Sequence, residues 1–257
     1  MKTIDEFHID VKDLTPEKIL PLMKKNGFVL IKNFLTKKEI QPVWNDLRIL
    51  ADAFYDGCGI PLEKIEPEES DKYFVKILSK RPDIQSELYD RMQMMPSLLS
   101  IPSMEKCRNV GTMLLETERV GVWPRMQMRM DIHKDEHNTI GWHTDYIYNK
   151  GTKSSYTFWM PMVNMNKDMG LPRIAIGSHN MDIELVETTG KRYNYTLSES
   201  TLSKLNIYDF EEINAGDLLL FHSMSIHTGN VNHISSRARL TSLFRIQNLN
   251  NLEVFRS

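Results

Sequence analysis

The residues of this chain best suited to chemistry are two histidines and one aspartate. His143 and Asp145 stand one residue apart within residues 142–146, which read Trp-His-Thr-Asp-Tyr, and His227 follows much later. Two imidazoles and one carboxylate that leave open positions on the metal form the ligand set of many non-haem Fe(II) sites. If residues 142–146 are extended, the side chains of His143 and Asp145 project from the same face, so one metal ion could bind both residues.

The third ligand has two candidates near the end of a predicted strand. Residues 215–227 begin with a Gly-Asp turn, continue through an apolar run and end in a polar segment that contains His222 and His227. The apolar run predicts a buried strand that delivers its polar end to a site. Composition alone does not choose between the two histidines, and a His-x-Asp triplet is a weak indication until further spacing supports it.

Residues 237–245 predict a strand with an unusual inward face. Strict alternation places Arg239, Thr241, Leu243 and Arg245 on the same side. A buried guanidinium without a partner is very costly, so an inward arginine requires an anion, and a carboxylate bound through two hydrogen bonds is its natural match. A structural Arg-Asp pair or a surface strand also fits this segment.

The first part of the chain, residues 1–113, predicts an α-rich region with one strand. A helix start at residues 15–18 combines Thr, Pro and Glu, and a capping box at residues 36–39 opens a longer helix. The β-branched, apolar run at residues 28–31 lies between them and predicts a buried strand. Helical patterns return near residues 83–94 and 102–110.

The linker between these helices predicts a loop. Residues 56–61 contain Gly and Pro, and the acidic stretch at residues 63–71 predicts a solvated, charged face.

The second part, residues 114–257, changes to strand periodicity. Alternation at residues 126–131, in parts of residues 155–163 and at residues 240–246 predicts a β-sandwich or barrel of the jelly-roll or cupin type. The polar, tyrosine-containing residues 181–212 interrupt the pattern and predict a lid or substrate insertion. We therefore expect one domain over residues 1–257, a jelly-roll core flanked by helices.

Composition limits the classes of partner. The chain has 257 residues, 41% hydrophobic, with 32 Lys plus Arg against 34 Asp plus Glu, and it carries no basic block, which argues against nucleic acid. No signal peptide and no apolar run of about 18 residues is visible, so we expect a cytoplasmic protein without a membrane partner. Cys58 and Cys107 are too few for a disulfide scaffold and predict reduced thiols.

With these motifs in view, the chain resembles the phytanoyl-CoA dioxygenase-like family of Fe(II)/2-oxoglutarate-dependent oxygenases. The likeness covers most of the chain and rests on matches to the family's motifs at residues 26–31, 129–131, 142–146, Trp159, 177–179, His227, Asn232, Arg239 and Arg245. Asn232 follows His227 as the family's pattern requires, so the resemblance favours His227 over His222.

The resemblance implies roles for these residues. His143, Asp145 and His227 would bind Fe(II) and leave positions for 2-oxoglutarate and O2. The co-substrate carboxylate would pair with Arg239 beside the Thr241 hydroxyl. The resemblance places Trp159 in the wall of this pocket and Asn232 near it. Strand alternation with the neighbouring methionines adds Gln127 to the predicted co-substrate residues, with structural hydrogen bonding as the alternative role.

The chain departs from the family at the arginine. Relatives have this arginine where the chain has Ala238, which is flanked by Arg237 and Arg239. The sequence that follows Arg239 resembles the family's strand, so Arg239 is the preferred candidate and Arg237 the alternative. Two further departures, Pro172 and Ile176, lie away from the predicted ligands.

The expected function is hydroxylation of a small molecule with release of succinate and CO2. Asp145 argues against halogenation, because halogenases of this superfamily replace that carboxylate with a small residue. Two alternatives stay open: a cupin-like binding protein without turnover, and an enzyme of the same family that catalyses desaturation, cyclisation or epimerisation. The sequence leaves open the substrate, the oligomeric state and the roles of Arg129, Arg245, Tyr146 and Tyr148.

Overall fold

A computed structural model describes residues 6–58, 65–123, 127–135, 139–149, 152–187 and 195–250. Its α-helices are α1 (Pro16–Asn26), α2 (Lys37–Cys58), α3 (Asp71–Lys80), α4 (Gln85–Met92), α5 (Pro96–Ser100), α6 (Glu105–Leu115), α7 (Asp145–Asn149) and α8 (Glu199–Leu202). Its strands are β1 (His8–Asp10), β2 (Phe28–Lys32), β3 (Val120–Val122), β4 (Gln127–Asp131), β5 (Ser155–Pro161), β6 (Met165–Asn166), β7 (Arg173–Ala175), β8 (Leu185–Glu187), β9 (Tyr195–Leu197), β10 (Ile207–Asp209), β11 (Glu212–Ile213), β12 (Leu218–His222), β13 (His227–Thr228) and β14 (Arg239–Asn248).

Within the described residues, the larger sheet contains seven strands and carries most of the core. Its order is β1-β2-β12-β5-β14-β3, and β4 also pairs with β14. Strand β14 is the longest, and its antiparallel pairing with both β5 and β4 places it inside the sheet. Its first eight residues are buried, including the polar ones, so this strand has side chains that face an enclosed site as well as the core.

A smaller sheet completes the barrel. It has the order β10-β7-β13, and two short pairs, β11 with β6 and β8 with β9, lie outside both sheets. Isolated bridges join His143 to His227 and His133 to Asn232, so the segment before α7 adds to the smaller sheet at its β13 edge.

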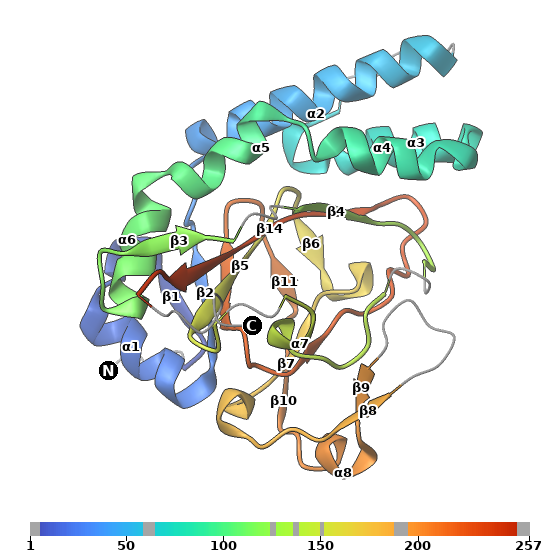
Figure 1. The fold of residues 1–257 in the computed structure, drawn as a ribbon. Coiled ribbons are helices and arrows are strands. Elements are labelled where there is room, and N and C mark those ends of the chain that lie inside the picture. The colour runs from blue at the N-terminus through green and yellow to red at the C-terminus, as the bar shows by residue number, and fades with distance from the viewer. Residues whose placement is uncertain are drawn as a thin grey trace.

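The N-terminal helices cover the larger sheet. Helices α2, α3, α4 and α5 form a layer over its β4 and β14 end, while α1 and α6 pack near β1, β2 and β3 (Figure 1). The residue that follows α4, Gln93, satisfies backbone hydrogen-bonding groups of the edge strand β4. The Gln93 side chain donates to the Met128 carbonyl at 2.6 Å and accepts from the Met128 amide at 2.8 Å, as a neighbouring strand would.

Local sequence signals account for the first elements. Pro16 opens α1 and Gly27 ends it with a φ of 79°, a conformation that costs glycine little. The predicted capping box is present: the Thr36 amide donates to Glu39 Oε2 at 2.8 Å, and the Glu39 amide donates to Thr36 Oγ1. The strand predicted at residues 28–31 is β2.

The predicted loop after α2 is partly wrong. Helix α2 continues through residues 56–58, and residues 59–64 lie outside the described part. The acidic stretch was expected to be solvated, but its last residue, Asp71, is fully buried. Asp71 begins α3 and pairs with Arg237, which the sequence places 166 residues away. Burial of this aspartate depends on a distant partner that a local charge pattern does not contain.

The predicted insertion at residues 181–212 also has more structure than expected. Residues 188–194 are not described, but β8, β9 and α8 lie in the described part of this stretch. Strand β10 pairs with β7 and so belongs to the smaller sheet rather than to an insertion. Among the described residues, no helix is long and apolar enough to cross a membrane.

Candidate metal centre

Three predicted ligands meet inside the barrel. His143, Asp145 and His227 each offer a ligand atom, and these atoms lie within 4.8 Å of one another. All three residues are buried. His143 Nε2 lies 3.9 Å from Asp145 Oδ1, and the two imidazole rings have centroids 4.2 Å apart. Two nitrogen donors and one carboxylate at this separation can hold a single divalent ion.

The backbone fixes the two histidines relative to each other. The amide of His143 donates to the His227 carbonyl at 2.9 Å, and the amide of His227 donates back to the His143 carbonyl at 2.9 Å. Asp145, however, is the first residue of α7, so the expectation that residues 142–146 are fully extended is wrong. The chain turns into a helix after His143, and this turn brings the aspartate to the histidines.

Hydrogen bonds set the ring nitrogen that faces the site. His143 Nδ1 lies 2.7 Å from the Gly141 carbonyl oxygen, and His227 Nδ1 lies 3.0 Å from the Ser225 carbonyl oxygen. A carbonyl only accepts, so each Nδ1 carries the hydrogen and each Nε2 retains its lone pair. Metal-ligating histidines are commonly held in this way. The donor set therefore fits Fe(II).

Electrostatics keep the ligands in the forms that bind metal. Burial lowers the pKa of His143 to about 3, with help from the neighbouring His227. Burial also lowers the pKa of His227. Burial alone would raise the pKa of Asp145, but the Arg245 guanidinium together with the neighbouring His227 and His143 holds this pKa well below its ordinary range. Neutral imidazoles and an ionised carboxylate are the metal-binding forms.

The alternative histidine lies elsewhere. His222 ends β12, and its ring packs edge-on against Tyr156 with centroids 5.2 Å apart. Its Nδ1 accepts a hydrogen bond from the Met224 amide at 3.1 Å. The structure groups His227, and not His222, with His143 and Asp145.

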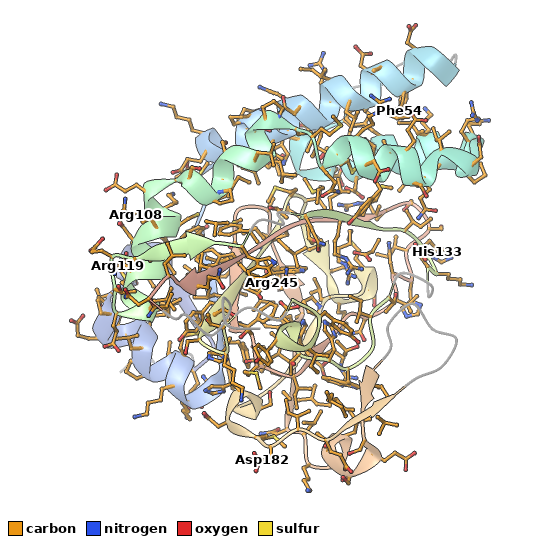
Figure 2. The ribbon with its side chains drawn as sticks, in the orientation of Figure 1. Phe54, Arg108, Arg119, His133, Asp182 and Arg245 are labelled. Carbon is orange, nitrogen blue, oxygen red and sulfur yellow. The ribbon has the colours of Figure 1, made fainter. Side chains whose placement is uncertain are left out.

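The Asp145 carboxylate is held by two other side chains. Arg245 donates from Nε to Oδ2 at 3.0 Å and from Nη2 to Oδ1 at 2.8 Å. Thr157 donates its hydroxyl to Oδ2 at 2.5 Å. Arg245 lies in the interior of the molecule (Figure 2). The sequence left the role of Arg245 open and did not single out Thr157.

The three residues open onto a pocket between the two sheets. The pocket contains about 610 Å³ of empty space, with its open mouth included. Its lining combines charged and apolar side chains: Gln127, Arg129, Asp131, Ile140, His143, Asp145, Trp159, Pro172, Phe221, His227, Thr228, Gly229, Arg239, Leu243 and Arg245. Of the predicted co-substrate residues, Arg239, Trp159 and Gln127 line this pocket.

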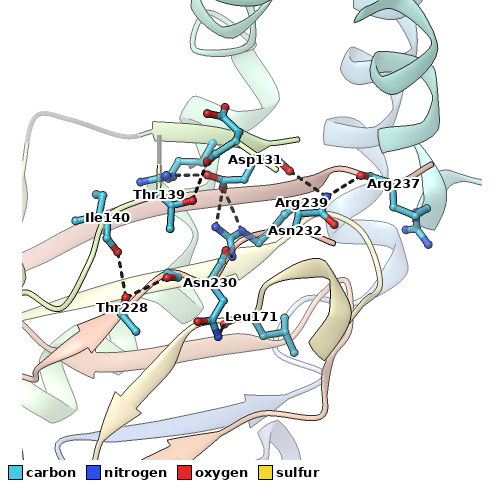
Figure 3. Close-up of polar contacts among 12 residues, drawn as sticks. Asp131, Thr139, Ile140, Leu171, Thr228, Asn230, Asn232, Arg237 and Arg239 are labelled. Atoms are coloured by element: carbon cyan, nitrogen blue, oxygen red, sulfur yellow. Dashed lines mark hydrogen bonds and ion pairs between the residues drawn. The ribbon is translucent and has the colours of Figure 1, made fainter. Parts of the chain in front are cut away.

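The preferred arginine and its alternative have different partners. Arg239 pairs with Asp131, with both Nε and Nη2 at 3.1 Å from Oδ2, and Asp131 also accepts from Arg129 at 2.8 Å (Figure 3). Arg237 instead pairs with Asp71, with Nε 2.7 Å from Oδ2 and Nη2 3.0 Å from Oδ1. Arg237 therefore ties α3 to the chain that precedes β14 and does not line the pocket.

Two other predicted co-substrate residues lie outside the pocket lining. The side-chain Nδ2 of Asn232 donates to the Arg237 backbone carbonyl at 2.7 Å (Figure 3). Its Oδ1 accepts from the Ile234 backbone amide at 2.9 Å. These bonds shape the loop before β14, and Asn232 is not among the residues that line the pocket. Thr241 is fully buried on the Arg239 face of β14. Its hydroxyl has no hydrogen-bond partner within the described chain.

The tyrosines after the metal motif lie beside it rather than in the pocket. The Tyr148 ring lies 5.6 Å from the His143 ring, centroid to centroid, and the Tyr146 amide donates to the Ser223 carbonyl. Neither tyrosine is among the lining residues.

The pocket residue that the sequence analysis did not single out is Asp131. Its alternation with Gln127 and Arg129 on β4 was the available signal.

Comparison with known proteins supports this architecture. A family model described as phytanoyl-CoA dioxygenase matches residues 23–240, which is most of the chain. No curated protein sequence matches the chain significantly.

Three solved structures illustrate the structural similarity. The non-heme alpha ketoglutarate dependent epimerase SnoN from nogalamycin biosynthesis is 12% identical, with a TM-score of 0.58 over 91% of this chain and 82% of SnoN. EctD from S. alaskensis, solved with 2-oxoglutarate and 5-hydroxyectoine, is 13% identical, with a TM-score of 0.60 over 89% of this chain and 74% of EctD. A nickel complex of the non-heme monooxygenase ThoJ is 14% identical, with a TM-score of 0.52 over 88% of this chain and 75% of ThoJ.

At such low identity these structures establish the fold alone, and the predicted jelly-roll core with flanking helices is confirmed. The match over residues 23–240 establishes more, and it confirms the predicted class of non-haem iron, 2-oxoglutarate-dependent enzyme, whose cofactors the buried His-Asp-His group fits. The chain belongs to the phytanoyl-CoA dioxygenase family.

Proposed function

We propose that this enzyme hydroxylates a small molecule, with Fe(II) and 2-oxoglutarate as cofactor and co-substrate and with succinate and CO2 as products. His143, Asp145 and His227 are the proposed iron ligands. The observation that carries the proposal is that His143 and His227 each hold their Nδ1 against a backbone carbonyl. Each Nε2 therefore keeps its lone pair, and the ligand atoms of both rings lie close to the buried Asp145 carboxylate. Fe(II), when bound, supplies the redox chemistry that couples decarboxylation of 2-oxoglutarate to oxidation of the substrate.

Arg239 is the proposed ligand of the distal carboxylate of 2-oxoglutarate. It lines the same pocket as the metal group, and only 6% of its side chain is exposed. A guanidinium in this setting binds a carboxylate through two charge-assisted hydrogen bonds. Thr241 follows on the same strand face just outside the pocket lining, and its hydroxyl, which has no hydrogen-bond partner among the described residues, supports a role as an additional donor to that carboxylate. Arg237 is engaged with Asp71, which supports Arg239 as the co-substrate residue.

Apolar walls and one amide complete the proposed site. Trp159 and Leu243 are opposite each other on β5 and β14, and both line the pocket, where they exclude water from the co-substrate. Gln127 faces the same space from β4 and offers a hydrogen-bonding amide.

The ionised Asp145 supports oxygenation rather than halogenation. This carboxylate occupies a position that a halide would need, and Arg245 and Thr157 hold it in place. EctD was solved with the small molecule 5-hydroxyectoine, and SnoN with nogalamycin RO. They support a small-molecule substrate here without identifying it. A cytoplasmic location and a single domain over residues 1–257 stay part of the proposal.

Succinate formation tests the proposal. Purified protein is loaded anaerobically with Fe(II) and 2-oxoglutarate and then exposed to O2 with a panel of small molecules, and succinate is measured. We expect substrate-dependent succinate release, a product 16 mass units heavier than its substrate, and no release by Asp145→Ala. Binding of both ligands without succinate for any substrate would favour a binding protein, and a product of unchanged mass would favour epimerisation.

A further inference from the structure

We propose that Arg245 and Thr157 are positioning residues that keep Asp145 a single-oxygen metal ligand and thereby hold one coordination position open for O2. The inference rests on the proposed function, because it concerns the metal held by His143, Asp145 and His227.

The sheet places both residues on the same carboxylate. Arg245 on β14 and Thr157 on β5 are direct Cα partners in the antiparallel ladder. Opposite residues of such a pair project their side chains to the same face about 5 Å apart. Both are buried, and both reach Asp145 at the start of α7. The arrangement therefore follows from the strand register and needs no flexible loop.

The contacts treat the two carboxylate oxygens differently. Oδ2 accepts from Thr157 Oγ1 at 2.5 Å and from Arg245 Nε at 3.0 Å. Because a carboxylate oxygen offers about two lone-pair sites, these two donors saturate Oδ2. Oδ1 accepts from Arg245 Nη2 at 2.8 Å and is the oxygen that lies 3.9 Å from His143 Nε2. The metal is thus left with Oδ1.

The number of coordination positions gives this asymmetry a function. If Fe(II) were bound with six ligands, the two histidines and one aspartate oxygen would supply three of them. A chelating 2-oxo acid would supply two more, which would leave one position for O2. Carboxylates also bind metals through both oxygens. If Asp145 did so, it would fill the last position, and saturation of Oδ2 by Thr157 and Arg245 prevents this.

A role of Arg245 in balancing the charge of Asp145 predicts different variant behaviour from a role in orienting the carboxylate. If Arg245 served only to balance the charge of Asp145, a lysine would suffice and the Thr157 hydroxyl would be dispensable. The planar guanidinium fork, with one N–H directed at each oxygen, fixes the orientation of the carboxylate, which a point charge does not. The variants that separate the two roles are Arg245→Lys, which keeps the charge, and Thr157→Val, which keeps the shape.

The test measures binding of nitric oxide, an O2 surrogate, to the Fe(II) protein saturated with 2-oxoglutarate. Under anaerobic conditions the paramagnetic iron-nitrosyl signal is titrated by electron paramagnetic resonance, and Fe(II) affinity is measured separately. We expect the wild-type protein and Thr157→Ser to bind nitric oxide equally. Thr157→Val and Arg245→Lys should bind it at least about tenfold more weakly, a change of about 1.4 kcal/mol, with Fe(II) affinity equal or tighter.

The possible outcomes separate this inference from the proposed function. Wild-type protein that fails to bind Fe(II) with 2-oxoglutarate contradicts the proposed function itself. If wild-type protein binds both but Thr157→Val and Arg245→Lys retain wild-type affinity for nitric oxide, the positioning role is wrong. Loss of Fe(II) affinity in place of nitric oxide affinity would also overturn it, because the pair would then support metal binding as such. Thermal unfolding of each variant verifies that the fold is intact.

Discussion

Strand β14 presents two buried arginines, six residues apart on one face, and each is paired with an aspartate in a different way. At the metal end, Arg245 and Asp145 form a one-to-one bidentate pair that Thr157 completes. At the other end, Arg239 shares the Asp131 carboxylate with Arg129. The first pair orients a proposed metal ligand, whereas in the second two guanidiniums contact the same carboxylate.

The difference explains how one strand can serve two functions. Arg239 lines the pocket and shares the Asp131 carboxylate with Arg129, so an incoming carboxylate can form charge-assisted hydrogen bonds with its guanidinium. At the other end, Arg245 already donates one hydrogen bond to each oxygen of Asp145. An incoming carboxylate therefore offers this pair no electrostatic gain. We therefore expect Arg239 to exchange its contacts when co-substrate binds and Arg245 to keep its own.

The largest expected effect is at the metal end. Asp145→Ala should reduce Fe(II)-dependent succinate formation by at least about a thousandfold, as expected when a residue that acts in a catalytic unit is lost. It should also lower the free energy of unfolding by about 3–5 kcal/mol, because Arg245 loses its partner in the interior. The double variant with Arg245→Met should recover much of that stability, measured by urea unfolding, but no activity. Recovery of activity would contradict the assignment of Asp145 as a ligand.

The next effect separates the two arginine candidates. Arg239→Met should weaken binding of 2-oxoglutarate by about a hundredfold, since loss of one partner of a buried charge pair costs several kcal/mol. Its Fe(II) affinity should stay unchanged. Arg237→Met should lower the melting temperature, because Asp71 loses its partner, but should keep 2-oxoglutarate affinity within about threefold. Anaerobic calorimetry measures both, and the reverse ranking would place the co-substrate residue two positions earlier.

The metal end should also make the stability of the metal-free protein depend on pH. Burial holds the pKa of His143 at about 3, below its ordinary value near 6.5, so the unfolded chain binds a proton that the folded protein does not. This contribution to stability is fully present above pH 6.5 and is lost as the pH falls towards 3. His143 alone should lower the free energy of unfolding by about 2 kcal/mol between pH 7 and pH 5. In urea titrations, His143→Gln should show a correspondingly smaller decrease, and an equal decrease would contradict this origin.

The smallest effect concerns Thr241. Its hydroxyl is buried without a partner in the described chain, so Thr241→Val should leave stability unchanged or slightly raised. If the hydroxyl donates to the co-substrate carboxylate, the same variant should weaken 2-oxoglutarate binding by about tenfold. Thr241→Ser is the matched control and should bind as the wild type does. Unchanged affinity in Thr241→Val would remove this residue from the co-substrate site.

The sequence predicted the residues whose spacing is a property of the family. His143, Asp145 and the arginine strand were recognisable because their separations along the chain follow the order of the jelly-roll strands. Composition left His222 and His227 open as alternatives, and the family resemblance favoured His227. The backbone pairing of His227 with His143 gives the physical reason, because it places the His227 ring beside the His143 ring.

The remaining contacts depend on distant partners. Asp71 belonged to an acidic run that local reasoning assigns to solvent, yet it is buried because Arg237 and the Ala238 amide meet it across the fold. The Arg245–Asp145 pair joins residues 100 positions apart, and the inward face of β14 predicted an anion without identifying which one. Such contacts arise from packing of separate elements, which periodicity and capping signals do not encode.

One measurement tests the central claim most directly. Fe(II) and 2-oxoglutarate are added anaerobically to the metal-free protein, and the visible charge-transfer absorption of a 2-oxo acid chelated to Fe(II) is recorded. The account predicts an absorption that saturates at one iron per chain, is absent from His227→Gln and Asp145→Ala and is retained by His222→Gln. Full absorption in His227→Gln, or its loss in His222→Gln alone, would contradict the proposed metal centre.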